Sequence, residues 1–340
     1  MRDEDALIAW LRDQLGEDGA WIGDDATSLP DGAWIATVDS QIAGTHFPPA
    51  LDPAVMARRL LAVNVSDLAA MGARPRWGLL TVAAPGDFPH RRFFRSFLRS
   101  ARHVGMRLVG GDLARQAHPA ATLTLLGEAF EAGRSLRRDT AQPGEVIWLG
   151  GTVGVSHLGQ QLLATVDAKD WAATATWHDM TRWLDDDVFQ ERRVIEAPRT
   201  LWPSIRRALV RHLLPRPQLR LSAWLIEHGG HTAIDVSDGV ARDLHRLCRK
   251  SEVGARLFDD APLFPAWARP LAEHLGIRPD LAAWTGGEDY VLLFTLPEGV
   301  RPPIGCVAIG EITAHRGELA FADGTPLAAA GWDHLDDGPG

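Results

Sequence analysis

Acidic side chains recur in this chain where an apolar segment ends or where a glycine turns the backbone. Asp39 closes the segment AWIATVDS, and Glu288 with Asp289 follows two glycines in TGGEDY. The other acids of this kind are Asp24, Asp25, Asp67, Asp112, Asp235 and Asp238. Separated carboxylates are typical ligands of hard divalent cations, and Mg²⁺ commonly pairs one or two of them with the phosphates of a substrate. The pattern therefore predicts a metal-centred phosphate site that needs no P-loop lysine.

Most of these acids also have a purely structural interpretation, and the pair Glu288 and Asp289 is the least explained by one. Asp67 lies in the apolar helical segment LAVNVSDLAAMGA, where it either shares a narrow polar stripe with Asn64 or meets a cation that offsets the cost of its burial. Gly-Asp-Asp before Ala26 is common turn chemistry, and Asp112 after two glycines has the same ambiguity. The acids of AIDVSDG could instead cap the helix that follows them. Only the combination of all these positions favours a metal site.

The basic residues and cysteines restrict the chemistry further. Lys169 and Lys250 are the only lysines, and neither follows a glycine, which excludes a Walker A loop. A formal net charge of -9 without a Lys/Arg block argues against nucleic acid as the main partner. Cys248 and Cys306 are too few for a cysteine-rich zinc site and fit a reducing compartment. With no apolar run of membrane-spanning length and no signal-peptide pattern, we expect a cytoplasmic protein that contacts no membrane.

The elements that must position these acids follow from the hydrophobic periodicity, which predicts an α/β fold. In the first half we expect helices over 4–15, 52–72 and 90–104, and strands over 33–38, 77–83, 107–109 and 121–130. In the second half we expect helices over 157–164 and 240–250, and strands over 145–149, 231–236, 290–296 and 304–309. Pro143-Gly144 marks the expected boundary. Domain 1–142 would then precede domain 143–340, which carries a Trp-rich helical insertion at about 167–205.

Several segments follow one another in a characteristic order along nearly the whole chain: IGDDAT, VDSQIAGTHF, LAVNVSDLAAMGARP, LVGGDLAR, RRDTAQPGEVIWLGGTVG, IDVSDGVARDL, TGGEDYVLLFT and GWDHL. In this combination the sequence resembles the thiamine-monophosphate kinase family of the aminoimidazole-ribonucleotide-synthetase-like superfamily, whose members use ATP. The resemblance implies two α/β domains of the α+β type, with an N-terminal mixed sheet that forms a barrel-like interface in a homodimer. It also implies ATP-dependent phosphorylation of thiamine monophosphate to thiamine diphosphate, with ATP as co-substrate and several Mg²⁺ ions in the cleft between the domains.

The resemblance assigns roles to individual residues. It implies metal ligands at Asp25, Thr37, Asp39, Asp67, Asp112, Asp235 and Asp238. It implies nucleotide contacts at Gly111, Asp112, Arg138 and Ser237, and thiamine-phosphate contacts at His46, Glu288 and Trp332. Because phosphoryl transfer depends mainly on positioning and charge neutralisation, the catalytic set would be Asp25, Asp67, Asp112 and Arg138. Without the resemblance, we would interpret Arg138 as part of a surface charge cluster and His46 as a routine loop histidine. Trp332 would then be an ordinary interface or core tryptophan.

The chain departs from the family pattern near the proposed site. Val38 stands where a threonine is usual, Leu113 and Ala114 replace hydroxyl residues in the run GGDLAR, and Thr27 replaces an alanine. These changes keep two alternatives open: a homologue that binds nucleotide or thiamine phosphate without catalysis, and a superfamily relative with another phosphoryl acceptor. The lack of a lysine or cysteine in the early glycine-rich loop favours the thiamine branch over the relatives that need one.

Overall fold

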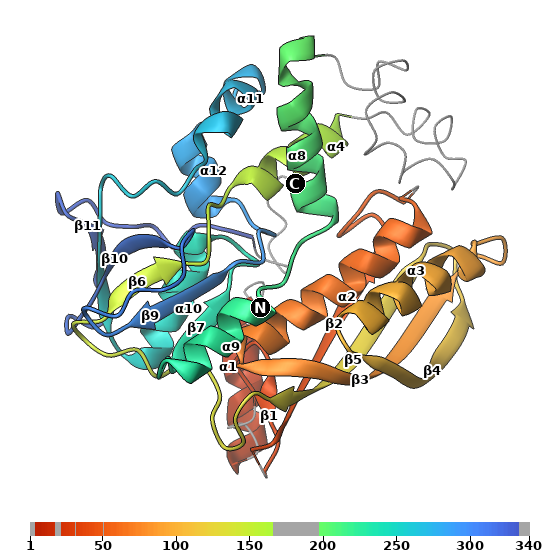
Figure 1. Ribbon diagram of the computed structural model, residues 1–340, viewed down its shortest axis with the longest axis horizontal. Helices are drawn as coiled ribbons and strands as arrows, with labels where there is room; N and C mark the ends of the chain where they lie inside the picture. Colours follow the sequence, from red (N-terminus) through yellow and green to blue (C-terminus); the bar gives the residue numbers. More distant parts are fainter. Residues whose placement is uncertain (1–3, 18–21, 31, 50, 166–196, 333–340) are drawn as a thin grey trace.

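The computed structural model describes residues 4–17, 22–30, 32–49, 51–165 and 197–332. Two sheets with packed helices lie beside each other and are connected through the long helix α2 (Pro53–Ala70), as Figure 1 shows. The predicted α/β class is confirmed. The predicted Trp-rich insertion lies mostly outside the described residues. Its described end is helical, in η2 (Arg199–Leu201) and α8 (Trp202–Leu213).

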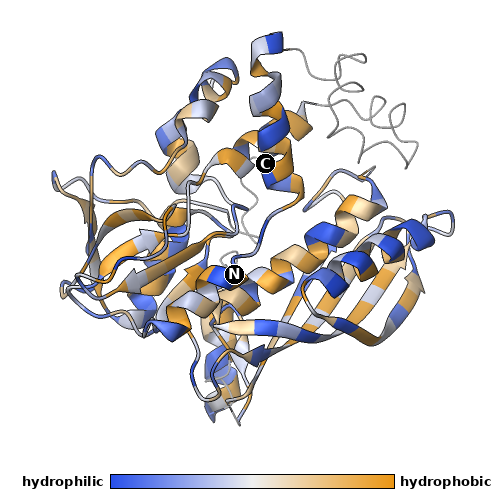
Figure 2. Cartoon of the chain, in the orientation of Figure 1, coloured by the Kyte–Doolittle hydropathy of each residue, from blue (hydrophilic) through white to orange (hydrophobic). Residues whose placement is uncertain are grey.

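The first sheet has five strands in the order β1-β2-β5-β3-β4. They are β1 (Thr27–Ser28), β2 (Trp34–Ile42), β3 (Ala73–Ala84), β4 (Arg107–Arg115) and β5 (Ala120–Ala129). Strands β3 and β4 pair in parallel, and the other pairs are antiparallel. Helices α2 and α3 (His90–His103) cover one face, whereas α1 (Glu4–Leu15) lies near the short strand β1 (Figure 1). Hydrophobic residues dominate these strands (Figure 2), and in β5 every second side chain is buried.

The second sheet has six strands in the order β11-β8-β10-β6-β9-β7, with only β11 and β8 parallel. The strands are β6 (Val146–Leu149), β7 (Thr232–Asp235), β8 (Gly254–Leu257), β9 (Leu292–Leu296), β10 (Val307–Thr313) and β11 (Leu319–Phe321). The remaining helices are α4 (Val155–Ala164), α9 (Leu219–Glu227), α10 (Val240–Ser251), η3 (Ala266–Ala268), α11 (Arg269–His274) and α12 (Pro279–Thr285). The expectations from the sequence did not include α9, α11, α12, β8 and β11.

Helix α2 begins where the sequence predicts. The Asp52 side chain accepts a hydrogen bond from the Ala54 backbone N–H at 2.8 Å, and Pro53 occupies the first turn, where no backbone donor is needed. The helix is buried on almost every side because it packs against the first sheet and α3 and also against α9 and β7. A helix in this position tolerates a polar side chain only where a partner meets it.

Several strand boundaries differ from the expectations at positions next to acids. Strand β2 continues to Ile42 and β4 to Arg115, so Asp39 and Asp112 lie within strands and not at their ends. Strand β9 begins at 292 because Glu288 and Tyr290 adopt φ angles of 63° and 50°, which a strand cannot contain. Strand β10 spans 307–313 instead of 304–309, since the chain turns just before it.

The two sheets divide the sequence cleanly. The first sheet uses residues up to 129, and the second begins at 146. The predicted domain boundary at 142/143 falls between them and stays a prediction. None of the helices in the described ranges has the length and apolar character needed to cross a membrane.

Candidate functional site

Three aspartates from separate segments come together, and we call them the aspartate trio. One carboxylate oxygen from each of Asp25, Asp67 and Asp235 lies within 4.8 Å of the other two. Asp25 precedes β1, Asp67 belongs to the last turns of α2, and Asp235 ends β7, so the trio joins the two sheets. Oxygen ligands of one divalent cation lie at most about 5 Å apart, because each bond to the ion is about 2.0–2.6 Å long. The spacing of the trio therefore suits a shared cation.

Hydroxyl side chains orient two members of the trio. Thr37 Oγ1 donates to Asp67 Oδ2 at 2.6 Å, and Ser66 Oγ donates to Asp235 Oδ2 at 2.6 Å. Thr37 is buried in β2, and Ser66 is buried in α2 next to Asp67. Each hydrogen bond uses one carboxylate oxygen and fixes the direction of the other. The narrow polar stripe of α2 thus faces a site, and Asn64 is fully buried beside it.

The acids of this site repel one another. Burial, followed by the charges of neighbouring aspartates, raises the pKa of Asp67 well above its usual value. Burial also raises the pKa of Asp25 well above normal, although Arg138 opposes the shift. The pKa of Asp39 rises to about 7 and that of Asp235 to about 6, with burial as the largest cause in both. A bound cation stabilises the ionised form of carboxylates whose pKa values are raised in this way.

One carboxylate oxygen in the trio has no protein partner in the described ranges. Asp25 Oδ2 is buried and accepts no hydrogen bond there. A buried acceptor without a donor is costly, so native proteins usually fill such a position with a donor, a water or an ion. An all-oxygen donor set with an unsatisfied anionic atom is the chemistry that Mg²⁺ selects. The residues present therefore fit a divalent cation.

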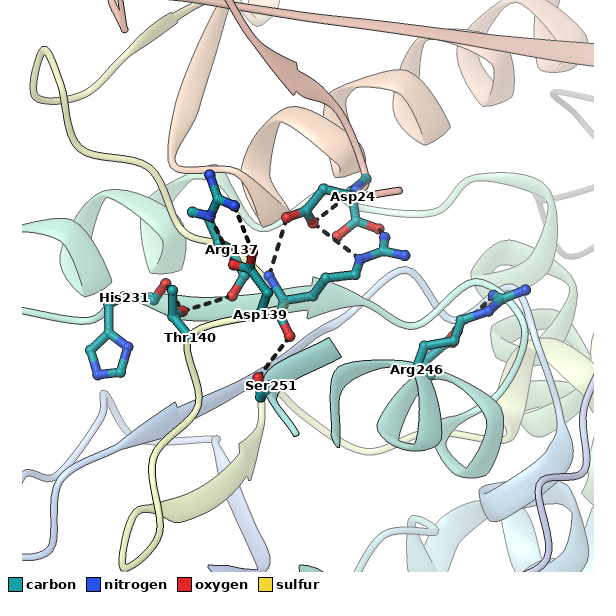
Figure 3. Close-up of polar contacts among 10 residues, drawn as sticks. Asp24, Arg137, Asp139, Thr140, His231, Arg246 and Ser251 are labelled. Atoms are coloured by element: carbon teal, nitrogen blue, oxygen red, sulfur yellow. Dashed lines mark hydrogen bonds and ion pairs between the residues drawn. The ribbon is translucent and has the colours of Figure 1, made fainter. Parts of the chain in front are cut away.

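Arg138 is held against Asp24 and Asp25, the acidic pair that precedes β1. Figure 3 shows Asp24 close to the segment that carries Arg137 and Asp139. Its Nε donates to Asp24 Oδ1 at 3.1 Å and its Nη2 to Asp25 Oδ1 at 2.5 Å. Ser251 Oγ donates to the Arg138 carbonyl at 2.9 Å. By contrast, Arg137 forms an ion pair with Asp139, in which Arg137 Nη2 lies 2.6 Å from Asp139 Oδ2. Arg138 is thus a buried, oriented cation and not a member of a surface charge cluster.

Glu288 lies in a different electrostatic setting. Arg59 Nη2 donates to Glu288 Oε1, and His212 Nδ1 lies 3.1 Å from Glu288 Oε2. Burial would raise the pKa of Glu288, but the Arg59 charge and the contacts with His212 hold it at about 2. Arg59 is fully buried in α2 and also donates from Nε to Gln41 Oε1 at 2.8 Å. The sequence expectations missed Arg59 and His212, although an arginine inside the apolar run ARRLLAV was a usable signal.

Asp289, the neighbour of Glu288, accepts hydrogen bonds from backbone N–H groups of another segment. Its Oδ2 accepts the Gly154 backbone N–H at 2.6 Å, and its Oδ1 accepts the Ser156 backbone N–H at 3.3 Å. These groups open α4, whose first N–H groups have no partner within the helix. Asp289 therefore caps a helix from a distant part of the chain.

Asp39 and Asp238 lie near the trio without belonging to it. The Asp39 backbone N–H donates to Asn64 Oδ1 at 3.1 Å, and its carboxylate interacts electrostatically with Asp235 and Asp238. Arg246 Nη1 forms an ion pair with Asp238. The Asp238 carboxylate is therefore already neutralised by a protein cation.

Ser237, Trp332 and His46 are further residues that the sequence predicts for the site. The Trp332 backbone N–H donates to the Asp238 carbonyl at 3.0 Å, and its side chain is 43% exposed. The Ser237 carbonyl accepts the Glu288 N–H at 2.6 Å. His46 Nδ1 accepts the Ile42 N–H at 3.1 Å in the turn after β2. Ser237 and Trp332 thus contact the loops that carry Asp238 and Glu288, close to the acidic site.

The structure does not bring Gly111 and Asp112 to the trio. Both are exposed on β4, the edge strand at the opposite end of the first sheet from β1 and β2. Gly111 has a clear local reason to be glycine: an added Cβ would lie 1.9 Å from the Leu80 carbonyl oxygen. The pairing of β4 with β3 accounts for Gly111 within the single chain.

Comparisons with known proteins show which chains and folds this protein resembles. Residues 23–129 match the family described as AIR synthase related protein, N-terminal domain. The chain is 33% identical to thiamine-monophosphate kinase of Escherichia coli strain K12, over 92% of this chain and 91% of that protein. The structure superposes on AaThiL complexed with AMPPCP and TMP with a TM-score of 0.81 and 24% identity, covering 98% of this chain and 97% of that one.

A further solved structure, thiamine-monophosphate kinase from Stenotrophomonas maltophilia K279a, is 28% identical with a TM-score of 0.69. It covers 96% of this chain and 98% of its own. The likeness thus extends through both sheets and is not confined to the N-terminal match. Together with the identity to the Escherichia coli protein, it shows that this chain belongs to the thiamine-monophosphate kinase family.

Proposed function

We propose that this chain transfers the γ-phosphoryl group of ATP to the phosphate of thiamine monophosphate and so makes thiamine diphosphate. An acceptor phosphate oxygen forms the new P–O bond, the bond between the γ-phosphorus and the β,γ-bridging oxygen breaks, and ADP leaves with the electron pair. The observation that carries this proposal is the aspartate trio with its unsatisfied Asp25 Oδ2, in a chain of this family. No general base is needed because the acceptor oxygen is already anionic.

The trio would hold Mg²⁺, with Asp39, Asp238 and Thr37 as further members of the metal site. When bound, Mg²⁺ supplies positive charge that offsets the repulsion between the two phosphate groups. The fit rests on the all-oxygen donor set and on the raised pKa values of Asp25, Asp67 and Asp235. Asp112 stays in the proposed set through the family resemblance alone, since it lies on the far edge strand.

The remaining residues would bind and orient the substrates. Arg138 offers a fixed guanidinium for a nucleotide phosphate, and Ser237 and Gly111 complete the proposed nucleotide contacts. His46, Glu288 and Trp332 would contact thiamine monophosphate. Trp332 supports this role because its exposed ring suits stacking on a cationic thiazolium. Glu288 would act mainly as a fixed negative charge, since Arg59 and His212 engage both of its oxygens.

We also propose a homodimer formed through the first sheet, with the reaction taking place in the cytoplasm, where ATP is available. Helices cover one face of this sheet, and large apolar side chains are exposed on its strands: Val38, Ile42, Trp77, Leu79, Val109 and Leu113. Contiguous exposed apolar side chains mark association surfaces. Val38 and Leu113, which depart from the family pattern, would then serve packing between protomers.

Purified protein with MgATP and thiamine monophosphate tests the kinase function, with thiamine diphosphate and ADP measured together. We expect equal amounts of the two products, and loss of both when EDTA removes the metal. Binding of nucleotide without product would replace the kinase proposal with the binding homologue. ADP formed only with another phosphorylated acceptor would replace it with a relative of different substrate.

A further inference from the structure

A groove of about 2180 Å³ lies away from the aspartate trio. Helices α2 and α3 form one side, and residues 214–221 with 303–306 form the other. The arginines that line it are Arg58, Arg91, Arg92, Arg95, Arg99, Arg216 and Arg220. No aspartate or glutamate is among its described lining residues. We call it the arginine groove. Its lining is positively charged, whereas the whole chain has a formal net charge of -9.

Among the residues that the structure describes, most of these arginines form no internal ion pair. Arg92 is the exception, with its Nε 2.7 Å from Asp52 Oδ1. Arg91, Arg95 and Arg99 are exposed and lie four residues apart on one face of α3. At a rise of 1.5 Å per residue they form a row about 12 Å long. Within the described part of the chain, none of these three has a carboxylate partner.

Two arginines also face each other across the groove. Burial and the nearby charge of Arg216 lower the pKa of Arg58. Arg58 belongs to α2, whereas Arg216 lies between α8 and α9. Each side of the groove therefore carries a positive charge, and the two charges repel each other. Like charges in contact are unfavourable unless an anion lies between them. The repulsion between Arg58 and Arg216 indicates that the groove binds a negatively charged ligand.

Much of the rest of the lining is apolar. Leu61, Val65, Leu214, Leu219 and Trp224 contribute to it. At its edge Ile304 is fully exposed, which is unusual for so large an apolar side chain on a loop. The groove thus combines apolar lining residues with a row of positive charges. A matching ligand would be apolar on one side and acidic on the other.

The size and the aromatic content of the groove select among such ligands. Small-molecule pockets usually enclose about 300–1000 Å³, so this groove is at least twice as large as one small ligand requires. Single-stranded nucleic acid usually stacks its bases on open aromatic rings. Here Trp224 is already stacked on His228, with ring centroids 4.1 Å apart, and Phe88 is buried. These features favour a protein segment over a small molecule or a nucleic acid.

We propose that the arginine groove docks an acidic amphipathic helix of a partner protein. The apolar face of the helix would lie on Leu219 and Trp224, and its carboxylates would pair with the arginine row of α3. Acids spaced four residues apart on the partner match Arg91, Arg95 and Arg99, which share the same helical spacing. The docking is independent of the proposed kinase reaction, because the groove contains no residue of the proposed active site.

The test uses a fluorescein-labelled synthetic helix of about 18 residues, with leucines at positions i, i+3, i+4 and i+7 and glutamates elsewhere. Fluorescence anisotropy with the full chain is measured in EDTA, so that no metal bridges the peptide to the aspartate trio. We expect saturable binding that Arg95→Glu/Arg99→Glu weakens about tenfold or more. The matched variant Arg269→Glu/Arg278→Glu, on exposed arginines outside the groove, should change the affinity by less than about twofold.

Controls separate helix docking from general attraction of anions. A scrambled peptide of the same composition should bind about tenfold more weakly. Equal binding of the scrambled peptide would overturn the proposal, and so would the absence of saturable binding. Tighter binding of oligo-dT, lost in Arg95→Glu/Arg99→Glu, would assign the groove to nucleic acid instead. If that variant unfolds, Arg91→Gln/Arg95→Gln replaces it, with an unchanged Tm as the proof of folding.

Discussion

Two clusters of charge each take one residue from helix α2, Asp67 in the aspartate trio and Arg59 beside Glu288, and they are built on opposite rules. In the aspartate trio, carboxylates meet carboxylates, and their pKa values rise. Around Glu288, a carboxylate meets Arg59 and His212, and its pKa falls to about 2. Burial opposes ionisation in both places, so the difference comes from the neighbours. The Glu288 cluster is complete within the protein, whereas the trio is incomplete without a cation.

This contrast separates acids that hold the fold from acids that await a ligand. Glu288 and Asp289 have protein donors on both carboxylate oxygens. Asp25 has a buried oxygen with no donor in the described residues. Substitution of Asp289 should therefore affect stability, and substitution in the trio should affect catalysis. Substitution of Glu288 should affect stability and also its proposed contact with thiamine monophosphate.

The largest expected effect is on catalysis in the trio. Asp67→Asn should lower turnover by about 10³-fold, equivalent to about 4 kcal/mol, because it removes a charged metal ligand. The folded protein should be at least as stable, since the change relieves repulsion with neighbouring acids. Steady-state kinetics and thermal unfolding measure both properties. Wild-type turnover in this variant would place Asp67 outside the metal site.

Breaking the Glu288 cluster should chiefly affect stability. Arg59→Met should lower the free energy of unfolding by about 3 kcal/mol, because it leaves Glu288 buried without its cation. The double variant Arg59→Met/Glu288→Gln should recover part of this loss. Arg256→Met, which removes the exposed pair with Glu311, should cost less than about 1 kcal/mol. Urea unfolding measures all three, and an Arg59 variant as stable as the wild type would contradict the proposed cluster.

The sequence predicted the three aspartates of the trio among seven metal ligands, but it did not predict the partners of Glu288, and the reason is physical. Asp67 could be singled out because a carboxylate in an apolar helix is costly, and Asp235 because it ends a strand. Arg59 carries the same type of signal, but its partner Glu288 lies 229 residues away in the chain. No local pattern predicts which distant groups will neutralise a buried charge. Only the packing of α2 against both sheets decides it.

In the fold, too, features set by neighbouring residues were predicted correctly, whereas features set by distant residues were not. The N-cap Asp52 and the following proline predicted the start of α2 correctly, because capping is local. The extents of β2 and β4 were wrong, because strand length depends on pairing with β5 and β3. The pairing also placed Asp112 on an edge strand, far from the trio. Glycine spacing alone could not reveal this separation.

A smaller effect concerns pH. Asp39 has a pKa of about 7 in the folded chain, above its usual value of 3.8, so the folded state holds an extra proton between about pH 4 and 7. Its contribution to stability is therefore complete at low pH and is lost as pH rises through 7. Between pH 5 and pH 8 the metal-free wild type should therefore lose about 2.5 kcal/mol of unfolding free energy through Asp39, and Asp39→Asn should not show this loss.

Urea unfolding in EDTA at the two pH values measures this difference. Asp139→Asn is the control of opposite sign, because Arg137 lowers the pKa of Asp139. Saturating Mg²⁺ should remove most of the loss at pH 8 in the wild type, since a cation favours the ionised acids. An equal pH dependence in the wild type and Asp39→Asn would mean that Asp39 ionises freely.

The smallest effect is expected at Asp289, which tests the division most directly because this acid is in the same segment as Glu288. Asp289→Asn keeps one acceptor oxygen for the backbone N–H groups that open α4, and should cost about 1 kcal/mol of stability. Turnover and the Mg²⁺ requirement should change by less than about twofold, because neither oxygen is available to a ligand. A tenfold loss of turnover at unchanged Tm would transfer Asp289 to the active site. It would also show that an acid with protein donors on both oxygens can still serve catalysis, and the contrast between the two clusters would no longer separate function from structure.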